Sequence, residues 1–349
     1  MDNQNSPLNF IRNQHSKDTK ITQTSIIVDA YSKLNETDSE PEVKGLFEIQ
    51  TANEVIKQAM EQPDPVQLYP PLILEHEFVI LFADTGVGKT VLYFQMAIDI
   101  SNKGYTTLYL DLELSKKQFQ KRYTSDESGK PIILPDNLYR LGFARLKKTP
   151  KEVSYEDYFF ESLTNAVKQT GAKVVFLDNL TKLAAGDTDS AQNAIPILER
   201  LNDLKADFGL TIIVLEHNKK VDTSRPIQLN DLQGSKMKSN LTDAVFTIGR
   251  SAKDKSIRYI KQLKVRDGEV IYDTENVKVC ELSKTNGYLS FTDIGFASEF
   301  EHLKEVTEKD RENQIEKIKE LHKAGNSLRA IGEELNITHM KVSRILKDL

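Results

Sequence analysis

The segment ADTGVGKT, residues 83–90, constrains the fold of this chain more than any other feature of the sequence. It follows the apolar run FVILFAD (78–84) and directly precedes VLYFQMAIDI, whose apolar residues have helical spacing. A strand, a glycine loop and a helix in this order form the context in which such a loop binds phosphate. Gly86 and Gly88 let the backbone curl so that successive N–H groups point at phosphate oxygens, and the helix N-terminus adds partial positive charge.

The side chains of this loop have separate predicted roles. Lys89 is expected to reach the β- and γ-phosphates of a nucleotide, and Thr90 to hold Mg²⁺ through its hydroxyl. Ala83 stands where the usual pattern GxxxxGK(S/T) has its first glycine. A glycine-containing turn that binds nothing is the alternative interpretation. The other residues predicted to contact the nucleotide are Asp84, Thr85, Gly86, Val87 and Gly88.

Further short apolar runs alternate with helical segments along the chain. They are TTLYLDLEL (106–114), KVVFLD (173–178), LTIIVLEH (210–217) and DAVFTIG (243–249). Runs that are apolar at every position suit strands buried on both faces, and helices between them indicate a parallel sheet. Two more alternating segments, RYIKQLKVR (258–266) and VIYDTENVKVCEL (270–282), are expected to finish the sheet as antiparallel strands. The predicted fold class is α/β, a mostly parallel sheet flanked by helices.

Three polar side chains follow or end these predicted strands. Asp178 ends a continuous apolar strand, where a charge is costly unless it serves a cation, and Mg²⁺ shared with Thr90 is the natural one. Glu113 ends the second strand, where a carboxylate can polarise water for attack on a γ-phosphate; a solvated acid is the alternative. His217 ends a further strand and is expected to sense the γ-phosphate, with a structural histidine as the alternative. Asn179 is expected to support Asp178.

Length and composition narrow the class of protein. A chain of 349 residues suits about two domains, and 39% hydrophobic with 28% charged residues is ordinary for a globular protein. No apolar run approaches the roughly 18 residues of a membrane span, and the polar N-terminus lacks the apolar core of a signal peptide. The single cysteine, Cys280, fits a reducing cytoplasm. Residues 1–45 read as a disordered leader, followed by a helix with Thr51 or Asn53 as its N-terminal cap.

Together, the glycine loop, Glu113, Asp178 and His217 resemble the RecA-like ATPase core over roughly residues 46–295. More narrowly, they resemble the RepA and KaiC-like branch, which includes plasmid-replication and replicative hexameric helicases. The resemblance implies that Glu113 is the catalytic base, Asp178 the Walker B acid and His217 the sensor. It also implies a homo-oligomer, most simply a hexamer, that acts on DNA.

The segment QLKVRDGE (262–269) resembles the Lys-x-Arg pair that reaches across a subunit boundary in this family. The resemblance implies that Lys264 and Arg266 act on the γ-phosphate of a neighbouring subunit. The segment between Gly249 and Gly268 contains seven Lys or Arg and two Asp, so its net charge is +5 in a chain whose net charge is −5. A solvated strand face is the alternative explanation.

Two further regions carry candidate contacts to DNA. The segment after His217 is lysine-rich, as a groove along single-stranded nucleic acid requires; its candidates are Lys219, Lys220, Lys236 and Lys238. The tail GNSLRAIGEELNITHMKVSRILKDL has the spacing of a helix-turn-helix capped at Ser327 and Thr338, and it resembles DNA-binding modules of resolvases and regulators. Residues 301–349 carry ten basic and ten acidic side chains, so a protein-docking cap is the alternative. The predicted duplex contacts are His339, Lys341, Ser343, Arg344 and Lys347.

The predicted organisation is a leader (1–45), a RecA-like ATPase domain (46–295) and a linker helix with a small all-α helix-turn-helix domain (296–349). The expected function is an ATP-hydrolysing, ring-forming motor or helicase-like protein that acts on DNA in plasmid or transposon replication or mobilisation. An ATP-switched DNA-binding regulator without unwinding activity is the second hypothesis. A small-molecule kinase explains neither the Lys264 and Arg266 pair nor the tail.

Overall fold

The computed structural model describes residues 42–44, 47–142, 149–179, 191–218, 222–233, 235–285, 287–305, 307–335, 337 and 339–347. The chain divides into two compact units, residues 1–64 and residues 65–349. The predicted leader lies outside the described residues except for 42–44, and the boundaries predicted near residues 45 and 295 stay predictions.

In the described residues of the first unit, two short strands precede a helix. Strand β1 (Glu42–Lys44) pairs antiparallel with β2 (Phe47–Ile49), and α3 spans Ala52–Met60. Of the two predicted caps, Thr51 is the one observed: its side chain accepts from the Glu54 N–H, while the Glu54 carboxylate accepts from the Thr51 N–H.

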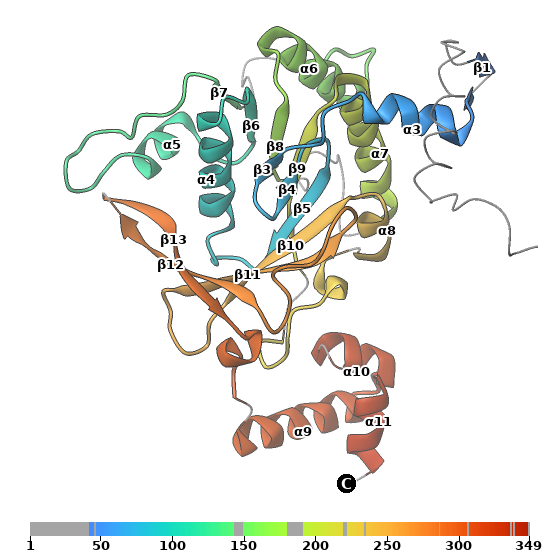
Figure 1. Ribbon diagram of the computed structural model, residues 1–349. Helices are drawn as coiled ribbons and strands as arrows, with labels where there is room; N and C mark the ends of the chain where they lie inside the picture. The colour runs from blue at the N-terminus through green and yellow to red at the C-terminus, as the bar shows by residue number, and fades with distance from the viewer. Residues whose placement is uncertain are drawn as a thin grey trace, which may run out of the picture. The chain divides into compact units, whose positions relative to one another are not determined.

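A nine-stranded sheet forms the centre of the second unit, in the order β13-β12-β11-β10-β5-β9-β8-β6-β7 (Figure 1). The strands from β10 to β7 in this order run parallel, and β11, β12 and β13 are antiparallel to their neighbours. This confirms the predicted α/β class. The strands are β5 (Phe78–Ala83), β6 (Thr107–Asp111), β7 (Leu138–Leu141), β8 (Val174–Asp178), β9 (Thr211–His217), β10 (Ala244–Arg250), β11 (Ile257–Val265), β12 (Val277–Thr285) and β13 (Tyr288–Ala297).

Some elements differ from the sequence prediction. The edge strands β7 and β13 were not predicted, because neither has a continuous apolar run. Strand β12 begins at Val277 rather than at residue 270, because residues 270–276 form a loop that the Gln262 side chain holds by accepting from the N–H groups of Ile271 and Tyr272. A short hairpin, β3 (Gln67–Tyr69) and β4 (Ile73–Leu74), precedes the sheet.

Helices cover both faces of the sheet, so that two separate hydrophobic cores form. Successive residues of β5 point to opposite faces: Phe78, Ile80 and Phe82 pack in one core, and Val79, Leu81 and Ala83 in the other. The first core is covered by α6 (Tyr155–Thr170) and α7 (Ala191–Phe208), and the second by α4 (Lys89–Asn102). The remaining helices of this part are α5 (Lys116–Arg122), α8 (Ser235–Asn240), η3 (Leu229–Asp231) and η4 (Glu299–His302).

Three helices follow the sheet: α9 (Glu308–Lys323), α10 (Leu328–Leu335) and α11 (His339–Lys347), drawn in red in Figure 1. Ile318, Ile331 and Val342 form their buried core, and the Ser327 hydroxyl accepts from the Ala330 N–H at 3.2 Å. Thr338, the second predicted cap, lies outside the described residues. No helix in the described part of the chain is long and apolar enough to cross a membrane.

Candidate nucleotide-binding site

The candidate site lies where the parallel strands end. The strand register pairs Ala83 of β5 with His217 of β9, and Asp111 of β6 with Asp178 of β8. Residues far apart in sequence therefore meet at the carboxyl edge of the sheet, where open α/β sheets bind their ligands.

Glycine is required at Gly88 of the phosphate loop for two reasons. Its φ of 98° lies in the left-handed region, which residues with a Cβ adopt only at a cost in conformational energy. A Cβ at this position would also lie 2.9 Å from the Leu282 side chain and 3.0 Å from the Phe291 ring. Gly86 has a φ of 76°. The loop therefore has the two conformations that the glycine pattern predicted.

Lys89, the first residue of α4, brings the loop and β9 together. Its Nζ donates to the Ala83 carbonyl at 2.6 Å and lies 3.0 Å from His217 Nδ1. Burial lowers the pKa of Lys89, and the carboxylates of Asp84 and Asp178 oppose this change. Because a charged Lys89 can only donate, Nδ1 accepts and a neutral His217 carries its proton on Nε2. The structure thus places the predicted sensor against the predicted phosphate-binding lysine.

Helix α4 is fixed to the two strands that carry Asp178 and His217. The buried Tyr93 hydroxyl donates to the Ile213 carbonyl of β9 and accepts from the Leu177 N–H of β8 at 2.8 Å. The N-terminus of α4, and the loop before it, are therefore held in register with the strand ends.

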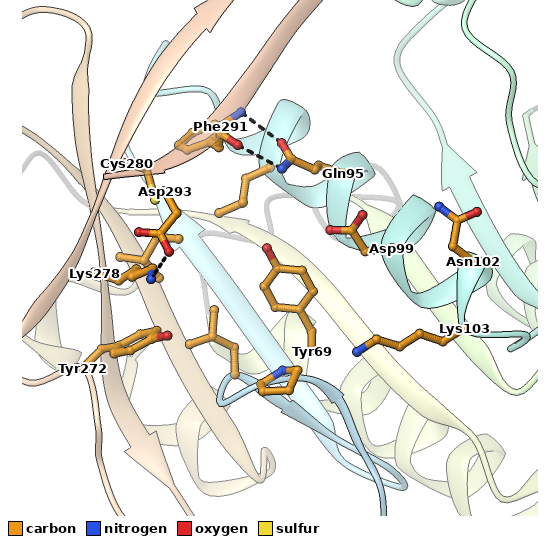
Figure 2. A pocket seen from close by; sticks show the side chains of 14 residues that line it. Tyr69, Gln95, Asp99, Asn102, Lys103, Tyr272, Lys278, Cys280, Phe291 and Asp293 are labelled. Carbon is orange, nitrogen blue, oxygen red and sulfur yellow. Dashed lines mark hydrogen bonds and ion pairs between the residues drawn. The ribbon is translucent and has the colours of Figure 1, made fainter. Parts of the chain in front are cut away.

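The β12–β13 hairpin is attached to the same helix. The Gln95 side-chain amide donates to the Phe291 carbonyl at 3.0 Å and accepts from the Phe291 N–H at 2.9 Å, as Figure 2 shows. Gln95 and Phe291 line a cavity of about 520 Å³ between α4, the β3–β4 hairpin and the antiparallel strands. None of the predicted site residues lines this cavity. Cys280 also lines it, and burial raises its pKa to about 11. That thiol therefore stays neutral near pH 7.

Asp178 is buried at the end of β8. The Tyr109 hydroxyl donates to its Oδ2 at 3.0 Å, and the Thr90 side chain also forms a hydrogen bond with this carboxylate. Burial raises the pKa of Asp178 to about 6, and the nearby Glu113 charge adds to the increase. The two residues predicted to hold Mg²⁺, Thr90 and Asp178, are therefore in contact.

Glu113 lies two residues beyond the end of β6 and is held from two sides. Asn179 Nδ2 donates to Glu113 Oε1 at 2.8 Å, while Asp111 Oδ1 accepts from the Glu113 N–H at 3.2 Å. Asp111 in turn pairs with Arg140 of β7 at 3.0 Å. Sequence reasoning missed Asp111 and Arg140. The acidic end of the second apolar run was a signal for Asp111, whereas β7 gave no strand signal.

A magnesium ion fits the donor set found here. Nucleotide sites usually hold Mg²⁺ through one or two protein oxygens together with phosphates and waters, and the Thr90 hydroxyl and Asp178 carboxylate supply such a set. Among the described residues, no group of three or more acidic, histidine or cysteine side chains forms a metal cage. The buried Asn179 Oδ1 has no partner among them and offers an acceptor to a water of the ion.

The raised pKa of Asp178 gives a prediction about pH. Magnesium-dependent hydrolysis should fall as the pH drops through about 6, because protonated Asp178 no longer binds the cation, and excess Mg²⁺ should shift this fall to lower pH.

The same pKa gives a prediction about stability. Since the pKa of Asp178 in the folded protein lies above its usual value, protonated Asp178 stabilises the fold at low pH, and this contribution is lost as the pH rises through about 6. Asp178→Asn should therefore stabilise the metal-free protein more at pH 8 than at pH 5, by at most about 3 kcal/mol. Equal thermal shifts at both pH values would contradict this.

Lys264 and Arg266 lie near the amino ends of the parallel strands, whereas the phosphate loop of their own chain lies at the carboxyl ends. Register places Val265 beside Ala244, which pairs with Val79 at the start of β5, whereas the phosphate loop follows Ala83. Four residues of strand separate these ends, about 13 Å. The Lys264 ammonium donates to the carbonyls of Ser239 and Thr242, and Arg266, 53% exposed, pairs with Asp243.

Two of the seven basic side chains between residues 250 and 266 are buried. Arg258 is 4% exposed and Lys261 is 5% exposed, and Lys261 pairs with the buried Glu299. The segment is therefore not simply a solvated strand face.

The predicted DNA contacts after β9 are distributed differently. Lys219 and Lys220 lie outside the described residues, as does the side chain of Lys236. Lys238 is 1% exposed and pairs with Glu216 at 2.6 Å. The prediction that Lys238 contacts DNA conflicts with this arrangement, because a buried Glu216 needs a cation and Lys238 supplies it.

This buried pair gives a prediction about stability. Lys238→Ala should lower the free energy of unfolding by about 3 to 5 kcal/mol, because it leaves the Glu216 carboxylate buried without a counter-charge. The double variant Glu216→Gln/Lys238→Met should lose less, and Lys255→Ala, at an exposed lysine, should change little. Denaturant unfolding measures all three. A Lys238→Ala variant as stable as the wild type would return this lysine to the candidates for DNA contact.

The predicted duplex contacts lie on α11. His339, Lys341, Arg344 and Lys347 are exposed and Ser343 is half-buried. Their role in binding DNA stays a prediction.

The chain is similar to one known domain family and to several solved structures. A family model described as an AAA domain matches residues 47–223, just over half of the chain. Among solved structures, a DnaB-like replicative helicase, described with its interactions with primase, aligns with a TM-score of 0.53 and 19% identity over 81% of this chain and 73% of that chain. A KaiC-like protein from the archaeon Pyrococcus horikoshii aligns with a TM-score of 0.46 and 16% identity over 63% of this chain and 91% of that chain.

A comparison with curated protein sequences gave no match. At 19% identity the likeness to the helicase shows the fold, which is RecA-like. The family model covers the phosphate loop, Glu113, Asp178 and His217. The chain therefore belongs to the AAA-domain family, as a P-loop ATPase of RecA-like fold.

Proposed function

We propose that this protein is a ring-forming ATPase that couples ATP hydrolysis to action on DNA. The observation that carries the proposal is the position of Lys264 and Arg266, at the sheet edge opposite their own phosphate loop. From there they do not reach the phosphate loop of their own chain, so a nucleotide that they contact belongs to another chain. A repeated head-to-tail contact gives a ring when its rotation closes, and a hexameric ring is the assembly that the sequence resemblance implies.

Hydrolysis at this site depends mainly on positioning and charge, as phosphoryl transfer does generally. The N–H groups of the loop and Lys89 bind the β- and γ-phosphates, and Thr90 and Asp178 would hold Mg²⁺, which neutralises charge on those phosphates. Glu113 takes the proton of the attacking water, and its bond from Asn179 keeps its carboxylate oriented.

His217 connects the phosphate site to the segment that follows β9. A γ-phosphate near Lys89 changes the acceptors available to that ammonium, and His217 is one of its present partners. Three lysines are predicted to contact single-stranded DNA: Lys219 and Lys220 follow this strand, and Lys236 belongs to α8. Nucleotide state is thus transmitted to DNA contacts along β9.

The setting inferred for this activity is the replication or mobilisation of a plasmid or transposon. The three C-terminal helices would recruit the ring to duplex DNA through α11. These helices also favour the second candidate function, an ATP-switched regulator that binds DNA without unwinding it. Strand displacement on a forked duplex separates the two, because only the motor displaces a strand.

The variant Lys89→Ala tests the proposed function at its centre. It removes the ammonium that contacts the terminal phosphates, so we expect hydrolysis to fall by about 10²- to 10³-fold, with no stimulation by single-stranded DNA. Steady-state phosphate release with and without DNA measures this, and circular dichroism checks that the fold is kept. Lys116→Ala, at an exposed lysine of α5, is the matched control. Unchanged turnover in Lys89→Ala would remove the proposal.

A further inference from the structure

Two arginines that the mechanism above does not use meet at the phosphate loop. Arg250 is the last residue of β10, and Arg258 lies directly opposite it on β11. Arg250 Nη2 donates to the Gly86 carbonyl at 2.8 Å, and Arg258 Nε donates to the Val87 carbonyl at 2.9 Å. Two guanidinium groups therefore hold successive carbonyls of the loop.

Their juxtaposition is unfavourable in the absence of an anion. Like charges directly opposite each other in an antiparallel pair destabilise a sheet. Burial lowers the pKa of Arg258, and the nearby Arg250 lowers it further. Among the described residues, neither arginine forms an ion pair with a carboxylate. The closest acid in sequence, Asp254, accepts from the backbone and side chain of Ser256, and its charge partly opposes the lowering of the Arg258 pKa.

The two side chains differ in exposure and in the number of N–H donors that remain available to a ligand. Arg258 is buried and also donates through Nη1 to the carbonyls of Lys255 and Ile257, at 2.7 Å and 2.8 Å. Arg250 is exposed, and the bond to Gly86 is the one hydrogen bond it forms within the described part of the chain. A guanidinium group has five N–H donors, so Arg250 retains donors and charge beside a loop whose own N–H groups bind phosphate.

We propose that Arg250 is a nucleotide-binding residue that acts in cis, through a contact from β10 to the phosphates held by the loop. Arg258 is a positioning residue that holds Val87 behind that contact. This inference rests on the proposed function, because it takes ATP as the ligand of the loop. It differs from the role of Arg266 in one measurable respect: the contribution of Arg250 does not depend on a second chain.

Titration of ATP and ADP into the full-length protein by calorimetry tests the inference. Arg250→Gln removes the charge and keeps an N–H donor on a side chain two bonds shorter, and it should weaken ATP binding by about tenfold to a hundredfold, the usual range for a hydrogen bond to a charged group. Arg250→Lys should recover part of this loss. The loss should be the same at every protein concentration.

Lys253→Gln is the matched control, since it makes the same change in net charge at an exposed position three residues further on. It should bind ATP as the wild type does. If Arg250→Ala binds ATP weakly while Arg250→Gln binds it like the wild type, the bond to Gly86 alone explains the effect and the inference is overturned. If the wild type itself binds no ATP, the proposed function fails. Wild-type binding that Arg250→Gln matches overturns this inference alone.

Discussion

Glu113→Gln is expected to lower kcat for ATP hydrolysis by about 10²- to 10⁴-fold while ATP still binds, because the variant loses a general base and keeps the shape of the site. The amide can still accept from Asn179 Nδ2 through its oxygen, as the carboxylate does at 2.8 Å. The loop and Lys89 are untouched. Single-turnover hydrolysis and equilibrium binding of ATP separate the two quantities.

Two further variants sharpen this test. Asn179→Ala should cause a smaller fall in kcat, since it removes the group that orients Glu113 and leaves the base in place. Glu127→Gln makes the same chemical change at an exposed glutamate and should have no effect. If Glu113→Gln weakens ATP binding and leaves single-turnover hydrolysis unchanged, Glu113 is a binding group and not a base.

The sheet and the residues at its carboxyl edge were largely predictable from sequence. Each of the loop, Asp178 and His217 is attached to a continuous apolar run, and parallel strands necessarily bring their carboxyl ends to one edge. The contact between Lys89 and His217 was not predicted, although the shared strand ends place both residues at the same site. Local sequence was sufficient because the signal and the site lie in the same short segments.

Features that depend on antiparallel register or on distant partners were not predictable. The pairing of Arg250 with Arg258 requires the exact register between β10 and β11, and a one-residue change would turn one side chain to the other face. Lys238 looked like a surface lysine because its partner, Glu216, lies in a different element. Edge strand β7, which supplies Arg140, alternates too weakly to be recognised.

Arg266→Ala should produce the largest loss, about 10³- to 10⁵-fold in kcat, if its guanidinium stabilises charge on a neighbour's transferred phosphoryl group. The arginine is available for this role. Its present partner Asp243 also accepts from the Phe78 N–H and pairs with Lys205, both at 2.8 Å, so the carboxylate keeps two donors when Arg266 leaves. The Arg266 side chain is 53% exposed and the Asp243 side chain 10%, so water screens the arginine in this pair and a phosphate contact can replace it.

A mixing experiment tests whether Arg266, called the finger below, acts on another chain. In rings made from equal amounts of Arg266→Ala and Lys89→Ala chains, about a quarter of the interfaces join an intact loop to an intact Arg266, so part of the activity should return. Mixing Arg266→Ala with the double variant Lys89→Ala/Arg266→Ala should restore nothing, because no intact finger is present. Activity is measured against dilution in parallel. A wild-type protein that remains monomeric and fully active at every dilution would contradict the role in trans. Arg266 would then have to reach its own phosphate loop across four residues of strand, about 13 Å.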